Sequence, residues 1–274
     1  VDPEDPATFY LGHATGGLWK TTNGGTTFSP LMKDAKVYSI GAVAVAPSDP
    51  RVVWVGTGES TDRNSAGFGN GVYRSTDAGT TFTPAGLPAS RAIARIAVHP
   101  GKPEVAFVAA AGDLWSKGGE RGLYRTTDGG KSWTKVLSAA APDDADTGCV
   151  DVALSPADPD LVYAALYARR RTPWSFTYGP ALTGGIFRSS DGGATWTKLT
   201  SGLPAQTGRI GLAVTPASPK VVVAIVQSDA GGTSGIDEVE SRAGGVFRSE
   251  DGGASFSRVS PLNARPFYFS QVRL

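Results

Sequence analysis

Acidic side chains outside the repeated turns are the residues of this sequence that could supply acid–base chemistry. Hydrolysis of a glycosidic bond, for example, needs two carboxyl groups about 5–9.5 Å apart. The acidic residues are scattered over several segments between predicted strands, and nothing in the sequence pairs two of them. The candidates are Glu59, Asp62, Asp113, Asp229, Asp237, Glu238 and Glu240, of which Glu59, Asp113 and Asp229 are the first to test.

A cluster of arginine and aromatic residues occupies the segment from Ala168 to Gly184. Arginine, tyrosine and tryptophan are enriched at binding hot spots, so this segment is the predicted binding site for a partner. The alternative is that the aromatic side chains only pack the loop against the protein. The predicted binding residues are Arg169, Arg170, Arg171, Trp174, Phe176 and Tyr178.

Other kinds of catalytic or metal site find little support in the sequence. His13 and His99 are the only histidines, and both lie at predicted strand ends, where a structural role is expected. Cys149 is the single cysteine, which leaves no internal disulfide and no cysteine-built metal site, and its apolar neighbours predict a buried side chain. No phosphate-binding loop is present, because the Gly-Gly pairs belong to repeated turns. We therefore expect neither a metal nor a cofactor.

The elements that must position these residues are five copies of one repeat. Its most regular part is a strand, a tight turn and a second strand, with Ser/Thr-x-Asp-x-Gly-x-Ser/Thr-Trp/Phe in the turn. The Asp carboxylate can accept hydrogen bonds from N–H groups of its own turn, and glycine supplies the positive φ that the turn needs. The side chains at this position are predicted to be structural: Asn23, Asp77, Asp128, Asp191 and Asp251.

A second hairpin, closed by a pair of prolines, completes each repeat. Pro47 and Pro50 form one pair, and Pro156 and Pro159 form another. Proline lies between strands because it has no N–H to donate to a strand ladder. Each repeat therefore predicts four antiparallel strands, and four-stranded units of about 40–50 residues or slightly more are typical of propeller blades.

The predicted fold is all-β, a single β-propeller domain of five blades. The expected blades are 1–34 together with 265–274, 35–88, 89–140, 141–203 and 204–262. The first repeat lacks its innermost strand, whereas residues 267–274 have the pattern of such a strand with no blade after it. We expect the C-terminal strand to complete the first blade, because closing the ring removes exposed sheet edges. The alternative is that the chain is part of a larger propeller.

The charge balance and the apolar pattern exclude two classes of partner. The 26 basic and 25 acidic residues nearly cancel, which argues against nucleic acid, since a basic stripe is expected of its binders. No apolar run reaches the ~18 residues that a membrane span needs. We expect no direct membrane span.

The five Asp-boxes and their proline-paired turns resemble the BNR repeats of the sortilin-like superfamily over essentially the whole chain. Three further segments are similar to the large secreted bacterial proteins described as glycosyl hydrolases with BNR repeats: 55–59, 171–175 and 208–211. Asp-box propellers also include sialidases, xyloglucanases, sortilin receptors and photosystem II assembly factors. A sialidase would need three arginines around the pore; Arg95 and Arg209 have inner-strand positions, but Tyr38 and Asp151 stand near the remaining equivalent sites. The resemblance implies a β-propeller and leaves the function open.

The leading hypothesis is a non-catalytic scaffold that binds a protein partner, as an extrinsic or accessory subunit of a membrane-associated complex. Its location would be periplasmic or extracellular. Its contact face would be that of the variable loops, which join the second and third strands of each repeat and the fourth strand to the next repeat. The alternative is a glycoside hydrolase that acts on extracellular polysaccharide through two loop carboxylates. A third possibility is a carbohydrate-binding propeller with Trp54, Trp115 or Trp174 as stacking platforms.

Overall fold

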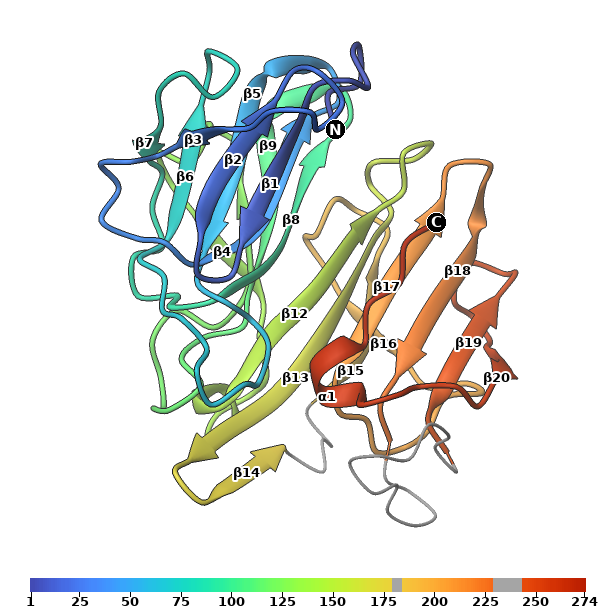
Figure 1. Ribbon diagram of the computed structural model, residues 1–274. Helices are drawn as coiled ribbons and strands as arrows, with labels where there is room; N and C mark the ends of the chain where they lie inside the picture. Colours follow the sequence, from blue (N-terminus) through green and yellow to red (C-terminus); the bar gives the residue numbers. More distant parts are fainter. Residues whose placement is uncertain (179–183, 229–242) are drawn as a thin grey trace.

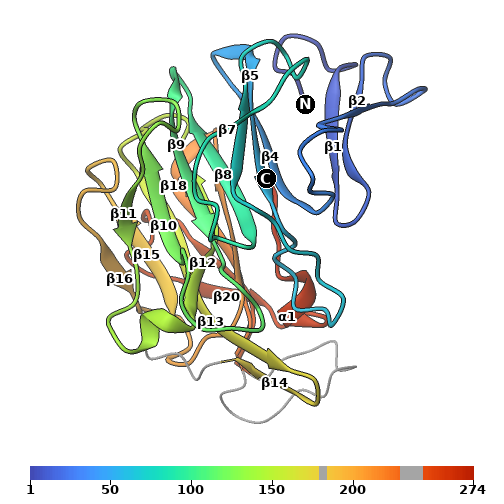
Figure 2. The ribbon, with the colours of Figure 1, turned by 90° about the vertical axis from the view of Figure 1, so that its left-hand side faces the viewer.

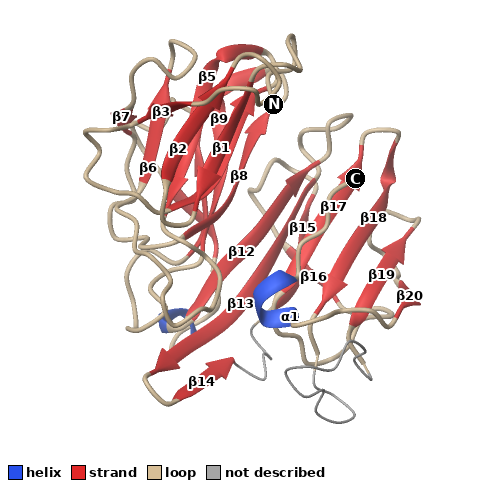
Figure 3. Cartoon of the chain, in the orientation of Figure 1, coloured by secondary structure: helices blue, strands red, loops and turns tan. Residues whose placement is uncertain are grey.

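The computed structural model describes residues 1–178, 184–228 and 243–274, and antiparallel β-strands dominate it (Figures 1 and 3). Five sheets follow one another along the chain. The first is β1 (Phe9–His13), β2 (Gly17–Thr21) and β3 (Ser29–Leu31); the second is β4 (Ile40–Ala46), β5 (Asp49–Thr57), β6 (Val72–Ser75) and β7 (Thr83–Pro84). The third is β8 (Ile93–His99), β9 (Lys102–Ala110), β10 (Gly122–Thr126) and β11 (Thr134–Leu137).

The last two sheets repeat this order. The fourth is β12 (Thr147–Leu154), β13 (Val162–Thr172), β15 (Gly185–Ser189) and β16 (Thr197–Leu199), with β14 (Ser175–Tyr178) paired to the far end of β13. The fifth is β17 (Ile210–Thr215), β18 (Ser218–Val226), β19 (Gly245–Ser249) and β20 (Ser257–Ser260). A short 3₁₀ helix, η1 (Asp143–Ala145), precedes β12, and one helical turn, α1 (Pro266–Phe269), follows β20. The predicted four-stranded units are confirmed for the second to fifth repeats.

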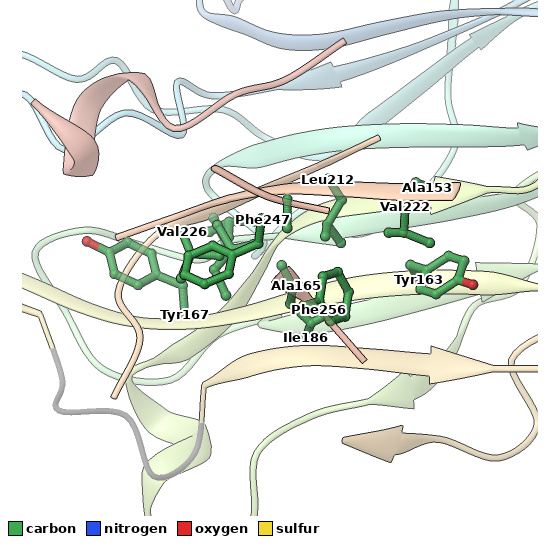
Figure 4. Close-up of a cluster of buried hydrophobic side chains, with 14 of the residues drawn as sticks. Ala153, Tyr163, Ala165, Tyr167, Ile186, Leu212, Val222, Val226, Phe247 and Phe256 are labelled. Carbon is green, nitrogen blue, oxygen red and sulfur yellow. The ribbon is translucent and has the colours of Figure 1, made fainter. Parts of the chain in front are cut away.

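The sheets stand side by side in chain order, with β4, β8, β12 and β17 as the innermost strands (Figures 1 and 2). Neighbouring inner strands contact one another, and β1 contacts β4. The apolar core therefore lies between the faces of successive sheets. Figure 4 shows the largest cluster, between the fourth and fifth sheets, in which Tyr163, Ile186, Leu212 and Phe247 are buried together. Each such side chain stabilises the fold by roughly 1.5–3 kcal/mol through the apolar area it removes from water.

The Asp-box turns also join successive sheets, and the second glycine of each turn explains how. A Cβ at Gly79 would lie 3.0 Å from the ring of Tyr10, and one at Gly193 would lie 2.8 Å from the ring of Phe107. Trp54 and Tyr163 fill the same position against Gly130 and Gly253. An aromatic side chain from one sheet, in β1, β5, β9 or β13, thus occupies the space that a side chain on the Asp-box turn of the next sheet would need.

Within each turn, the Asp-box side chain binds its own loop. Asp191 accepts hydrogen bonds from the Ser189 hydroxyl (2.7 Å), the Thr195 N–H (2.9 Å) and the Thr195 hydroxyl (2.6 Å). These hydrogen bonds lower the pKa of Asp191, and the one from the Thr195 hydroxyl has the largest effect. Asn23 makes the corresponding contacts through its amide with Thr21 and Thr27. The geometry gives these side chains a role in the turn itself.

The C-terminal segment does not complete the first sheet, and the expectation that it would is wrong. The first sheet has three strands, while residues 266–269 form α1 and residues 270–274 form no strand. Instead the segment lies against β17, where a Cβ on Gly211 would be 2.7 Å from the Ser270 carbonyl oxygen. In the same way, a Cβ on Gly41 of β4 would meet the carbonyl oxygen of Ile93 in the neighbouring inner strand, β8. The segment therefore occupies the place of a further inner strand beside β17 and is held there by inter-sheet packing.

The segment from 168 to 184, expected to be a loop, is partly a β-hairpin. β13 continues to Thr172, and β14 pairs with it through Arg171 opposite Phe176. Alternate residues in this part of β13 have different partners: Arg169 pairs with Asp62 in the interior, and Arg170 pairs with Asp146, which follows η1. No helix in the described ranges is long and apolar enough to cross a membrane.

Candidate functional site

The loop that follows β5 carries the first of the acidic candidates, Glu59. Arg63 donates two hydrogen bonds to the Glu59 carboxylate, Nε to Oε1 at 2.6 Å and Nη2 to Oε2 at 2.5 Å, and the Thr61 hydroxyl donates a third. Burial raises the pKa of Glu59, but the hydrogen bonds from Arg63 and Thr61 outweigh it, so the pKa is lowered. Glu59 is therefore an ionised carboxylate and is suited to the role of a base or nucleophile rather than an acid.

Asp62, three residues further on, lies in the interior and forms a buried ion pair with Arg169 of β13. Arg169 Nη1 donates to Asp62 Oδ1 at 2.6 Å, and the side chains of both residues are fully buried. The Tyr167 hydroxyl donates to the other carboxylate oxygen at 3.0 Å. Arg169 and Arg209 also donate to the Ser60 carbonyl oxygen, each at 2.8 Å. These contacts fix the loop after β5 to strands of the fourth and fifth sheets.

Asp113 organises its own loop, whereas four other acidic candidates lie outside the described residues. The Asp113 carboxylate accepts hydrogen bonds from the Trp115 N–H and the Ser116 hydroxyl, both at 2.9 Å, and Arg91 lies 3.8 Å away. Asp229, together with Asp237, Glu238 and Glu240, lies outside the described residues. The described ranges contain no group of three His, Cys, Asp or Glu side chains that could hold a metal ion.

A pocket of about 380 Å³ opens on the same face, and we call it the arginine pocket. Three segments far apart in the sequence meet there: the loop after β5, the end of β13 and the residues around α1, which Figure 2 shows beside that loop. The buried carboxylate of Glu59 pairs with one of the guanidinium groups of the pocket, that of the partly exposed Arg63. The residues that line the pocket are Thr61, Arg63, Asn64, Arg171, Arg265 and Tyr268.

The predicted binding residues have different positions in the structure. Arg169 is buried and paired with Asp62, and Arg170 is paired with Asp146, so both guanidinium groups already have partners within the protein. Arg171 lines the arginine pocket, and its guanidinium carbon lies 5.2 Å from the centre of the Phe176 ring. Phe176 in turn packs against Phe267, with ring centres 5.5 Å apart. The backbone of Tyr178 pairs with that of Arg169 in the hairpin. A binding role for these six residues stays a prediction.

Of the three tryptophans expected as sugar platforms, only Trp174 is well exposed. Trp54 is completely buried and donates to the Pro103 carbonyl oxygen at 3.2 Å. Trp115 is partly buried in the Asp113 turn. Trp174 is 88% exposed, in the turn between β13 and β14.

Sequence reasoning missed Arg63, Arg265 and Tyr268 as parts of a site. Arg63 follows Glu59 by four residues, and this spacing was the only local signal. Arg265 and Tyr268 fall in a segment whose alternation predicted a strand, so their contact with the loop after β5 was invisible in the sequence. The Phe176–Phe267 contact and the pocket exist because the segment docks beside β17 instead.

A second charged group lies on the inner strands. Asp151 of β12 is buried, accepts hydrogen bonds from the N–H groups of Val152 and Leu212 (2.9 Å each) and lies 3.8 Å from Arg95. Burial, only partly offset by Arg95, raises the pKa of Asp151. Its hydrogen bond to Leu212 joins β12 to β17, so its described contacts are structural.

The repeated sheets and their docked turns define the class of protein: a β-propeller of BNR/Asp-box repeats. Residues 124–135 match the BNR/Asp-box repeat. The crystal structure of a GH74 enzyme from Niastella koreensis has the same fold, with a TM-score of 0.63 at 21% identity over 94% of this chain and 37% of that one.

Two curated proteins are similar in sequence, and both are xyloglucanases. The probable oligoxyloglucan-reducing end-specific xyloglucanase of Neosartorya fischeri is 32% identical over 140 residues, which is 48% of this chain and 15% of that protein. The xyloglucanase of Hypocrea jecorina is 25% identical over 253 residues, which is 85% of this chain and 28% of that protein. The chain thus spans less than a third of the length of either relative.

These similarities contradict the leading hypothesis of a non-catalytic protein-interaction scaffold and favour the glycoside hydrolase alternative. The physical basis of the scaffold hypothesis is also weaker than the sequence indicated. Arg169 and Arg170, which motivated it, are engaged in ion pairs within the protein.

Proposed function

We propose that this chain is part of a glycoside hydrolase that processes polysaccharide outside the cytoplasm, in the periplasm or the extracellular space. The similarity to two xyloglucanases is the observation that carries the proposal. In this proposal the arginine pocket contacts the glycan, because it is a concave site on the variable-loop face and its volume falls in the usual range for ligand pockets, about 300–1,000 Å³.

Glu59 is the carboxylate that we propose for the chemistry. It forms an ion pair with the pocket residue Arg63, and its lowered pKa keeps it ionised at neutral pH, as a base, a nucleophile or a stabiliser of positive charge must be. A general acid needs a second carboxyl group with a raised pKa. No acidic residue is among those that line the pocket, so the acid would come from another segment of the protein.

The test is hydrolysis of xyloglucan and other polysaccharides by the full chain, followed through the release of reducing ends. We expect Glu59→Gln to lower kcat by at least about 100-fold, the usual contribution of an acid–base group. The matched control is Asp49→Asn, which also removes a carboxylate paired with an arginine, at the opposite end of β5. Loss of hydrolysis in both variants, full activity of Glu59→Gln, or no cleavage of any glycan by the parent chain would each refute the proposal.

A further inference from the structure

The loop after β5 is tied at both of its ends to the segments that precede β4 and β8. At its start, the Gly58 N–H donates to the Ser39 carbonyl oxygen at 2.8 Å. At its end, the Gly67 carbonyl oxygen accepts a hydrogen bond from the Ser39 hydroxyl at 3.1 Å. The Gly69 N–H donates to the Arg91 carbonyl oxygen at 2.8 Å. We call this set of contacts the loop junction.

The backbone segments of the loop junction approach one another as closely as glycine allows. A Cβ on Gly58 would lie 1.9 Å from the Arg91 carbonyl oxygen, and one on Gly69 would lie 2.2 Å from the Thr57 carbonyl carbon. Gly58 also has a φ of 87°, which a residue with a Cβ rarely adopts. The side chains that the junction carries therefore start from well-fixed backbone positions.

Two exposed aromatic side chains come from the loop junction. Tyr38, which precedes Ser39, is 67% exposed, and Phe68, which follows Gly67, is 47% exposed. A Cβ on Gly67 would lie 2.9 Å from the Ser39 Cβ, so the Cα atoms of Tyr38 and Phe68 are at most about 14 Å apart. The Arg91 guanidinium carbon lies 4.6 Å from the centre of the Phe68 ring and packs against one face of it. Much of both aromatic side chains is left open to solvent.

Glu59, the carboxylate proposed for the chemistry, belongs to the same junction. Its N–H donates to the Gly67 carbonyl oxygen at 2.9 Å, so its backbone lies within one residue of the second aromatic side chain. The charged groups at the junction are paired. Glu59 binds Arg63, and Arg91 lies 3.8 Å from the Asp113 carboxylate. Because the charges of each pair cancel, the junction favours a neutral over a charged sugar.

We infer that Tyr38 and Phe68 are the stacking residues of the glycan site beside Glu59, an inference that rests on the proposed function. A neutral sugar ring has C–H groups on its faces and hydroxyl groups around its rim. An exposed aromatic ring packs against such a face as it does against other apolar surfaces, while the rim stays in water. Two rings on fixed backbone positions lose little entropy when they bind, so they can hold neighbouring parts of one polysaccharide chain next to the carboxylate.

Affinity electrophoresis of the full chain through a native gel that contains xyloglucan measures binding without requiring cleavage. A gel that contains polygalacturonate is the charged comparator. We expect xyloglucan to retard the parent chain more strongly, and Tyr38→Leu and Phe68→Leu each to raise the Kd about three- to tenfold. Tyr38→Phe and Phe68→Tyr keep the ring and should stay within about twofold of the parent. The matched control is Phe28→Leu, which removes an exposed ring from the first Asp-box turn and should leave the Kd unchanged.

Hydrolysis of xyloglucan gives a second measurement. The two leucine variants should raise KM by the same factor and leave kcat within about threefold, whereas Glu59→Gln should lower kcat. Because both aromatic side chains are exposed, the urea midpoint of the leucine variants should equal that of the parent. An equal midpoint with a raised KM distinguishes a binding role from a structural one.

The outcomes separate this inference from the proposed function. If glycan is cut but the leucine variants keep the parent KM and Kd, the inference is wrong and the proposed function stands. If polygalacturonate retards the chain as strongly as xyloglucan, or if the leucine variants lose only self-association in sedimentation, the inference is again wrong. If the rings bind xyloglucan and no glycan is cut, the proposed function fails and the stacking residues stand. If no glycan binds and none is cut, both fail.

Discussion

Replacement of Arg169 by methionine tests how the variable-loop face is held together. The substitution keeps an unbranched apolar stem but removes the guanidinium group, and so takes away the cation that pairs with the fully buried Asp62 carboxylate. The Ser60 and Gly112 carbonyl oxygens would each lose a hydrogen bond, of 2.8 and 3.1 Å. Removal of one partner from a buried ion pair costs about 3–5 kcal/mol, because the other charge stays buried without compensation. We expect the free energy of unfolding to fall by this amount.

Urea unfolding at neutral pH, followed by tryptophan fluorescence, measures the effect in Arg169→Met, Asp62→Asn and the double variant. The double variant should cost less than the sum of the two single variants, by about 2–3 kcal/mol, because the second substitution no longer strands a charge. Arg170→Met is the matched control, since Arg170 and its partner Asp146 are partly exposed and such pairs contribute about 0–1 kcal/mol. A cost below about 1 kcal/mol for Arg169→Met, or strict additivity of the two buried substitutions, would show that this pair does not anchor the loop.

Three further predictions concern the repeats, the cysteine and the C-terminal segment. Hydrogen bonds from the Thr81 hydroxyl, which has the largest effect, the Thr81 N–H and the Ser75 hydroxyl lower the pKa of Asp77 to about 2. The ionised Asp77 therefore stabilises the folded protein above about pH 4, and this stabilisation is lost as the pH falls from about 4 to 2. Asp77→Asn, which Asn23 shows to be compatible with the turn, should weaken this acid dependence in urea titrations at pH 3 and pH 7, and an unchanged acid dependence would contradict the assignment. Burial raises the pKa of Cys149, so a thiol reagent should modify it only after unfolding in urea; rapid modification of the folded protein would be inconsistent with its burial. Gly211→Ala should cost about 1–3 kcal/mol through overpacking against Ser270 and expose the C-terminal segment to carboxypeptidase, and equal digestion of both proteins would show that the segment is not docked there.

The repeats could be predicted from the sequence because their determinants are local. The Asp-box side chain, its hydroxyl partners and its glycines lie within a few residues of one another, so the pattern records the whole interaction. The role of the second glycine is different, since the aromatic ring that requires it, such as Phe107 against Gly193, comes from the preceding sheet. The repeat pattern includes both residues of this contact, but it does not show that they touch.

The C-terminal segment and the arginine pocket could not be predicted for the same reason. The alternation in residues 267–274 is compatible with an inner strand, but alternation does not say which neighbour the segment packs against. The structure places it against β17, and this placement brings Arg265 and Tyr268 to the loop after β5. The arginine cluster at 169–171 was visible in the sequence, but its division between interior and pocket depends on the register of β13 with β14.

That division gives the pocket its rigidity. Asp62 and Arg63 are adjacent in the chain, and the first is fixed in the interior by Arg169 while the second lines the pocket. On the opposite wall, Arg169 is fixed in the interior, and Arg171, two residues along the same strand, lines the pocket. Both walls are therefore held by one buried ion pair, which limits their relative movement before any ligand binds. Because a preorganised site loses less entropy on binding, Arg169→Met should weaken binding of the proposed glycan even though Arg169 cannot touch it, whereas Arg170→Met should not.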